Sequence, residues 1–170
     1  GVTIPFKVSI IKHLDELDDN AKKIGAVNVV LNKDGKLIGG NTDGEGAVMA
    51  LKEKTKIKGK KVILLGAGGA ARAIAFAIKD AGGELIILNR TVADAQVLAK
   101  AVGVKFGDLN KLESEIKSAD VLINSTSVGM FPKEDESLVS KELLHSSLII
   151  QEVVSNPRET KLLRDAKATG

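Results

Sequence analysis

Residues 60–73, KKVILLGAGGAARA, constrain the fold of this chain more than any other stretch. An apolar run ends abruptly at glycine, and small residues then lead into a helical pattern. The spacing is G-x-G-x-x-A, the dinucleotide-binding fingerprint with alanine in its last place. Gly66 permits a sharp turn after the strand, Gly68 lets backbone N–H groups approach a pyrophosphate, and Ala71 lets the helix lie close to the sheet. The pyrophosphate is expected at the helix N-terminus, where unpaired amides and the helix dipole favour negative charge.

The flanking sequence completes one βαβ unit around this fingerprint. One face of the predicted helix carries Ala71, Ile74, Ala75 and Ile78. Gly82 and Gly83 end that helix, and residues 84–88 are typical of a second buried parallel strand. Because glycine-rich turns are common, the motif alone is a weak signal, and this context is what favours nucleotide binding.

The residues after that second strand indicate which dinucleotide is bound. NAD-binding units place an acidic side chain here to hold the ribose 2′-hydroxyl. This chain instead has Asn89, Arg90 and Thr91. Because a guanidinium suits a 2′-phosphate, the sequence favours NADP over NAD, with a surface arginine as the alternative interpretation.

The composition excludes several classes of protein. The 170 residues are 44% hydrophobic and 28% charged, as in one ordinary globular domain or two small ones. A net charge of +3 and the lack of Tyr and Trp do not indicate nucleic-acid binding. No apolar run is long enough to span a membrane. The absence of cysteine fits a reducing cytoplasm, and the two histidines, His13 and His145, are too far apart in sequence to suggest a metal centre.

Hydrophobic periodicity and turn residues predict the remaining elements. Helices are expected over residues 7–24, 47–54, 71–81, 92–102 and 109–118, and from Asn156, as cap, and Pro157 onward. Strands are expected over residues 2–4, 26–31, 60–65, 84–88, 104–106, 120–124 and 147–154, with a hairpin signal at Asp34-Gly35. The alternation of strands and helices predicts an α/β protein with a doubly wound parallel sheet.

Three polar segments before the nucleotide-binding unit carry candidate chemistry: residues 3–7, Asn28 and residues 41–43. A dehydrogenase that oxidises a secondary alcohol needs a group to take the hydroxyl proton as hydride leaves. Lys7 and Asp43 have suitable chemistry, although a solvated first-turn lysine and an Asx turn or helix cap are the alternatives. The amide of Asn28, between apolar neighbours, is expected to need buried partners.

Seven segments together resemble the shikimate/quinate dehydrogenase family. They are residues 2–7 (VTIPFK), 24–28 (IGAVN), 40–44 (GNTDG), 66–72 (GAGGAAR), 89–91 (NRT), 124–130 (NSTSVGM) and 156–160 (NPRET). The segments follow the family order at near-family spacing over essentially the whole chain. The resemblance implies NADPH-dependent, reversible reduction of 3-dehydroshikimate to shikimate, a step of aromatic amino-acid biosynthesis.

The resemblance also implies roles for individual residues. Lys7 and Asp43 would form the catalytic pair beside the reacting hydroxyl of the substrate, with Thr3 and Asn28 binding its other hydroxyls. The implied cofactor-binding residues are Gly66, Ala67, Gly68, Gly69 and Ala70 at the pyrophosphate, Asn89, Arg90 and Thr91 at the 2′-phosphate, and Thr126, Ser127 and Val153 toward the nicotinamide. No metal ion is implied.

Four positions depart from the family pattern. Glu152 stands where aspartate is common, and Ser155 stands where a substrate-binding tyrosine is usual. Asp94 replaces a second basic residue after the Asn-Arg-Thr triplet, which weakens the NADP preference. Val29 replaces a threonine.

We therefore expect a partial α/β substrate-binding domain over residues 1–57 and a Rossmann-type NADP domain over residues 58–170, with the active site in the cleft between them. Both ends are expected to be cut, because the family's paired N-terminal serines and C-terminal glutamine helix lie outside the sequence. The expected function is NADP-dependent shikimate dehydrogenase in the cytoplasm, acting on a small-molecule substrate without nucleic-acid or membrane partners, and a homodimer is left open. The alternatives are a cofactor-binding module without turnover and a quinate/shikimate dehydrogenase with relaxed cofactor choice.

Overall fold

The apolar runs after residue 60 form a five-stranded parallel sheet in the order β6-β5-β4-β7-β8, in a computed structural model that describes all of residues 1–170. Its strands are β4 (Lys61–Leu65), β5 (Glu84–Leu88), β6 (Lys105–Gly107), β7 (Val121–Asn124) and β8 (Ile149–Glu152). The direction of strand succession reverses between β4 and β7, which is the position where Rossmann-type sheets bind ligands. The predicted fold class, a doubly wound α/β protein, is confirmed.

Helices cover both faces of this sheet. One face carries α2 (Asp43–Lys52), α3 (Gly69–Asp80) and α4 (Val92–Val102), and the other carries α5 (Leu112–Ile116) and α6 (Lys161–Thr169). Successive residues of β4 enter different cores, since Val62 and Leu64 pack with α3 and α4 whereas Ile63 and Leu65 pack with α5 and α6. This two-sided burial explains why the strands are continuous apolar runs rather than alternating ones.

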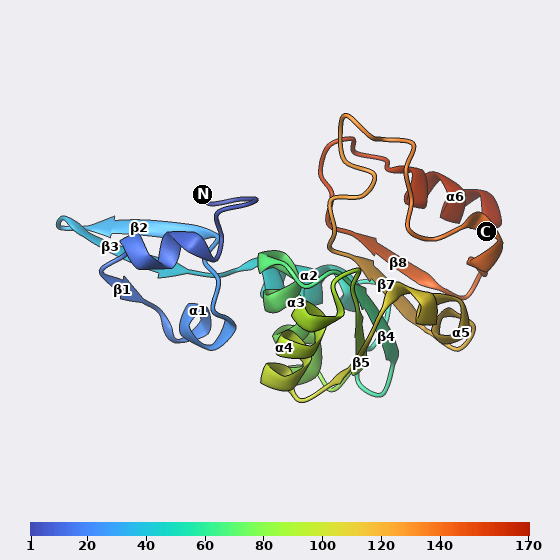
Figure 1. The fold of residues 1–170 in the computed structure, drawn as a ribbon, viewed down its shortest axis with the longest axis horizontal. Coiled ribbons are helices and arrows are strands. Elements are labelled where there is room, and N and C mark those ends of the chain that lie inside the picture. Colours follow the sequence, from blue (N-terminus) through green and yellow to red (C-terminus); the bar gives the residue numbers. More distant parts are fainter.

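The N-terminal lobe has a separate sheet, in the order β1-β3-β2. Its elements are β1 (Glu16–Leu17), α1 (Asp19–Ile24), β2 (Val29–Lys33) and β3 (Lys36–Gly40). Asp34 and Gly35 join β2 to β3 with φ angles of 54° and 87°, which confirms the predicted hairpin turn. This lobe stands apart from the larger sheet, and β3 leads into α2, which lies against α3 (Figure 1). The predicted boundary between residues 57 and 58 stays a prediction.

The predicted helix over residues 7–24 is wrong. The chain forms a 3₁₀ turn, η1 (Ser9–His13), then β1, and only then α1. The helix begins late because Asp18 is extended: its carboxylate accepts from Ala21 N at 2.6 Å, and its own N–H donates to Gly39 O in β3. Residues 2–4 form no strand, and Val2 makes one backbone bond to Asn28.

Several predicted boundaries were also wrong. The strand expected from residue 26 begins at Val29, and the helix expected from residue 47 begins at Asp43. Two glycines conceal this helix start in the sequence, and one of them, Gly44, is required by packing. A Cβ added there would lie 2.4 Å from Ala73 O of α3. The strand expected over residues 147–154 is limited to β8, and the region 109–118 divides into η2 (Leu109–Lys111) and α5.

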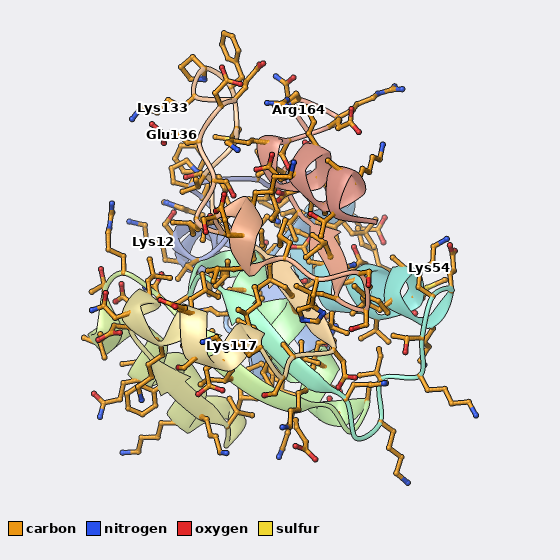
Figure 2. The ribbon with its side chains drawn as sticks, turned by 90° about the vertical axis from the view of Figure 1, so that its right-hand side faces the viewer. Lys12, Lys54, Lys117, Lys133, Glu136 and Arg164 are labelled. Carbon is orange, nitrogen blue, oxygen red and sulfur yellow. The ribbon has the colours of Figure 1, made fainter.

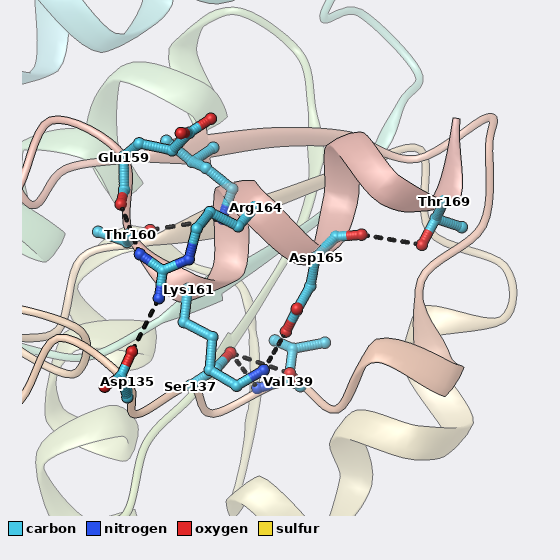
Figure 3. Close-up of polar contacts among 10 residues, drawn as sticks. Asp135, Ser137, Val139, Glu159, Thr160, Lys161, Arg164, Asp165 and Thr169 are labelled. Carbon is cyan, nitrogen blue, oxygen red and sulfur yellow. Dashed lines mark hydrogen bonds and ion pairs between the residues drawn. The ribbon is translucent and has the colours of Figure 1, made fainter.

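The last helix begins at Lys161 rather than at Pro157, so the predicted Asn156 cap is wrong. Thr160 is the N-cap, and its hydroxyl accepts from Leu163 N while donating to Glu152. The loop after β7 is tied to this helix, because Arg164 donates to Asp135 at 3.0 Å (Figure 3). Lys133 and Glu136 of the same loop form an ion pair with each other at 3.2 Å (Figure 2).

Asp120 ties the start of β7 to β4. Its carboxylate accepts from Lys60 Nζ at 2.8 Å and from Lys61 N at 2.9 Å, and these bonds, the Lys60 bond first, hold the pKa of Asp120 below its usual range. A lowered folded-state pKa gives stabilisation that is present above the unfolded value of about 3.9 and lost as the pH falls through the folded value. We therefore expect Asp120→Asn to lower the Tm by about 1–4 °C near neutral pH.

The same substitution should make little difference once the pH lies below the folded-state pKa of Asp120. Thermal unfolding followed by circular dichroism over a pH series checks this. A Tm difference of constant size down to the acid end would show that the carboxylate charge is not responsible.

Candidate active site

A cleft of about 350 Å³ opens at the carboxyl ends of the parallel strands. It is lined by the turn after β4, the ends of β5 and β7, and residues 4–8 of the N-terminal lobe. The lining residues are Ile4, Pro5, Lys7, Val8, Gly66, Ala67, Gly68, Gly69, Ala70, Asn89, Ser125, Thr126 and Ser127. Eight of the predicted cofactor-binding residues are therefore brought together with Lys7 in one cleft.

The glycine turn has the geometry that an anion site requires. Gly66 adopts a φ of +107°, and a Cβ there would lie 2.9 Å from Ser125 Oγ, so only glycine fits without strain. A Cβ at Gly68 would meet open space, so the backbone there is accessible to a ligand. Helix α3 starts at Gly69 without a side-chain cap, which leaves its first amides free for a pyrophosphate.

Arg90 lies beyond this turn with its guanidinium free. It is exposed and takes part in no ion pair or side-chain hydrogen bond, and it borders a hollow of about 160 Å³ with Asn89, Thr126 and Ser127. Asp94, the acidic departure from the family pattern, makes no ion pair with Arg90. The cation is therefore available to a 2′-phosphate.

The N-terminal lobe brings Lys7 and Asp43 into direct contact. Lys7 Nζ lies 2.5 Å from Asp43 Oδ2, and the two side chains are 14% and 21% exposed. Asn28 Nδ2 donates to Asp43 Oδ1 at 2.7 Å, so both carboxylate oxygens are held. A solvated lysine is thus excluded, and Asn28 lies before β2 rather than within a strand.

Asn41, a buried residue of the predicted polar segment 41–43 to which the sequence assigned no separate role, sets the position of Asp43. Asn41 is 3% exposed, donates to Ala26 O at 2.9 Å and accepts from Asp43 N at 3.0 Å. Asn28 Oδ1 accepts in turn from Thr42 N at 3.0 Å. Little in the sequence signalled this role, because the helix was expected from residue 47 and the observed N-cap is Thr42 rather than Asn41.

Lys7 also lies directly against the nucleotide-binding turn. A Cβ added to Gly69 would lie 2.7 Å from Lys7 Cβ, so the glycine permits this close approach. The acid–base candidates and the first turn of α3 therefore form one surface.

The structure does not bring every predicted site residue to the cleft. Thr3 is exposed, and its side chain makes no hydrogen bond. Val153 is 38% exposed at the end of β8, and Thr91 is the N-cap residue of α4. None of the three lines the cleft, and their roles stay predictions. Asn28 and Asp43 are also not lining residues and reach the cleft only through Lys7, and Arg90 borders the neighbouring hollow instead.

Comparison with known proteins identifies the family. The model for "Shikimate / quinate 5-dehydrogenase" matches residues 48–161, and that for "Shikimate dehydrogenase substrate binding domain" matches residues 1–30. The chain belongs to the shikimate/quinate dehydrogenase family. The first match covers the nucleotide-binding turn and the predicted 2′-phosphate site, and the second covers Lys7 and Asn28.

Individual members of this family match over nearly the whole chain. The shikimate dehydrogenase (NADP(+)) of Pyrococcus abyssi is 47% identical over 170 residues, which are 100% of this chain and 63% of that relative. A shikimate dehydrogenase solved in complex with NADP+ superposes with a TM-score of 0.91 at 43% identity, covering 99% of this chain and 61% of that one. The enzyme from Thermus thermophilus, solved with NADP(H) and shikimate, gives 0.86 at 39% identity, covering 99% and 62%. The chain thus spans less than two thirds of the length of these relatives.

None of the helices combines the length and the apolar character that a bilayer span requires.

Proposed function

We propose that the protein acts as an NADP-dependent shikimate dehydrogenase that reversibly reduces 3-dehydroshikimate to shikimate. The observation that carries this proposal is the Lys7–Asp43–Asn28 cluster, which lies against Gly69 at the start of α3. An acid–base group beside a dinucleotide-binding turn is the arrangement that alcohol oxidation by a nicotinamide needs. The names of the similar proteins support the same substrate and cofactor.

The residues present fit NADP. The open backbone at Gly68 and the free amides of α3 suit its pyrophosphate, and the unpaired Arg90 suits its 2′-phosphate. When bound, this cofactor supplies the hydride-transfer chemistry of the reaction. The chain itself binds the cofactor, orients it and handles the proton.

The proton of the substrate hydroxyl is proposed to pass to the Lys7–Asp43 pair in the oxidation direction and to return from it during reduction. The Asp43 carboxylate is fixed through both oxygens, by Lys7 and by Asn28, so the pair is positioned before substrate arrives. Low exposure of both side chains excludes most of the water that would otherwise weaken their interaction. Thr3 and Asn28 are proposed to bind further substrate hydroxyls.

A steady-state assay tests the proposal. Shikimate with NADP+ should give saturable reduction of the nicotinamide, followed by its absorbance, with NAD+ and quinate as comparison substrates. If NADPH binds but shikimate supports no reduction, the proposal fails and the protein is a cofactor-binding module. A homodimer and a cytoplasmic location stay predictions.

A further inference from the structure

A second polar cluster lies behind the cleft, where β7, β8 and α6 meet. It consists of Asn124, Thr126, Glu152 and Thr160. Asn124 is 3% exposed and Thr160 is fully buried at the start of α6 (Figure 3). Only Thr126 among the four lines the cleft.

Neutral donors alone surround the Glu152 carboxylate. Oε1 accepts from Asn124 Nδ2 at 3.0 Å and from Val154 N at 3.0 Å. Oε2 accepts from Asn124 Nδ2 at 3.1 Å and from Thr160 Oγ1 at 2.9 Å. No lysine or arginine pairs with it. Because an ionised carboxylate can only accept hydrogen bonds, every one of these partners must donate.

This requirement, together with the Val128 carbonyl, which accepts from Asn124 Nδ2 at 3.3 Å, fixes which way the Asn124 amide faces. Its nitrogen must point to Glu152, so its oxygen must point to Thr126. Asn124 Oδ1 accepts from Thr126 N at 3.1 Å and from Thr126 Oγ1 at 2.7 Å. The Thr126 hydroxyl therefore donates its single proton to Asn124 Oδ1 and has none left for another acceptor.

The oxygen of that hydroxyl is left with acceptor capacity only. Thr126 Oγ1 accepts from Val128 N at 3.2 Å, which uses one of its two lone pairs. The remaining lone pair can accept a hydrogen bond from an amide or a hydroxyl of a ligand in the cleft. It repels a phosphate oxygen, which is itself an acceptor.

We propose that Glu152 is a positioning residue of the dinucleotide site. Acting through Asn124, and together with the Val128 carbonyl, it fixes the Thr126 hydroxyl as a hydrogen-bond acceptor toward an amide or hydroxyl group of the bound dinucleotide. This inference rests on the proposed function, because it requires a dinucleotide in the cleft. Thr160 completes the shell around Glu152 without contacting Asn124 or Thr126.

The isosteric change Glu152→Gln tests the relay in the protein without any ligand. Glutamine offers one oxygen and one NH₂ group, so at least one present donor would face another donor. Hydrogen exchange at the Thr126 and Val128 amides should accelerate at least about fivefold if each loses a net hydrogen bond. Glu159→Gln is the matched control, because Glu159 is exposed and pairs only with Lys167.

NADPH titration tests the consequence for binding. Glu152→Gln should raise the Kd about threefold to tenfold, as expected for one neutral hydrogen bond. Thr126→Val should do the same by removing the acceptor, and adding Glu152→Gln to it should cause no further loss. Thr160→Val should lower the Tm while leaving the Kd nearly unchanged, which separates positioning from general stability.

The outcomes discriminate between the two proposals. If the unaltered protein binds no NADPH, the proposed function fails. Unchanged amide exchange in folded Glu152→Gln overturns the relay, whatever the protein binds. Unchanged NADPH affinity in Thr126→Val overturns the acceptor role, even if Glu152→Gln does not fold.

Discussion

Lys7→Ala and Asp43→Ala should each lower kcat for shikimate oxidation about 10²- to 10⁴-fold while leaving NADPH affinity nearly unchanged. The expected loss is that of a general acid–base group, because each change removes one partner of the Lys7–Asp43 ion pair, whose charged atoms lie 2.5 Å apart. Alanine keeps the Cβ of Lys7, the atom that lies against Gly69, so the wall of the nucleotide-binding turn should survive.

The control for this pair is Lys36→Ala. Lys36 also forms an ion pair, with Glu16 at 2.9 Å, but both side chains are exposed and lie on β1 and β3. Steady-state kinetics and NADPH titration on all three variants separate the two sites. Substantial turnover by both site variants would mean that the Lys7–Asp43 pair is structural rather than catalytic.

Arg90→Ala should weaken NADPH binding by about 1–3 kcal/mol and leave NADH binding nearly unchanged. The reason is that Arg90 is exposed, has no competing carboxylate partner and borders the hollow that shares Asn89, Thr126 and Ser127 with the cleft. Only NADPH carries the 2′-phosphate that such a cation recognises.

Arg164→Ala provides a matched arginine control, since Arg164 forms an ion pair with Asp135 in the loop after β7. Fluorescence titration with both nucleotides measures the difference. Equal losses for NADPH and NADH in Arg90→Ala would rule out recognition of the 2′-phosphate by this side chain.

Local sequence signals predicted the nucleotide-binding half of the fold well. The turn at Gly66, the burial of Ala71 and the α4 span over Val92–Val102 depend on residues close in sequence, and all three are confirmed. The N-terminal lobe was harder, because an apolar spacing of three and four residues fits both a helix and the actual series of η1, β1 and α1.

Tertiary contacts decided the features that sequence reasoning missed. Asn156 and Thr160 are both good helix caps, and the Glu152 contact selects Thr160. Residue chemistry alone marked Lys7 and Asp43 only as suitable, and their pairing was predicted from the family resemblance, because the two residues lie 36 positions apart in sequence. A lone asparagine such as Asn41 or Asn124 does not reveal in sequence which groups it will bind.

We infer that the cleft at the carboxyl ends of the parallel strands holds NADP, with Lys7 in its wall and Asp43 paired with Lys7. The most direct measurement is a crystal structure of the protein grown with NADP+. We expect pyrophosphate density at the amides of residues 68–70, the 2′-phosphate at Arg90 and the nicotinamide on the side of Thr126. Dinucleotide density at the amino ends of the strands, in the hollow bordered by Lys61, Lys79 and Lys105, would show that the cleft is not the NADP site.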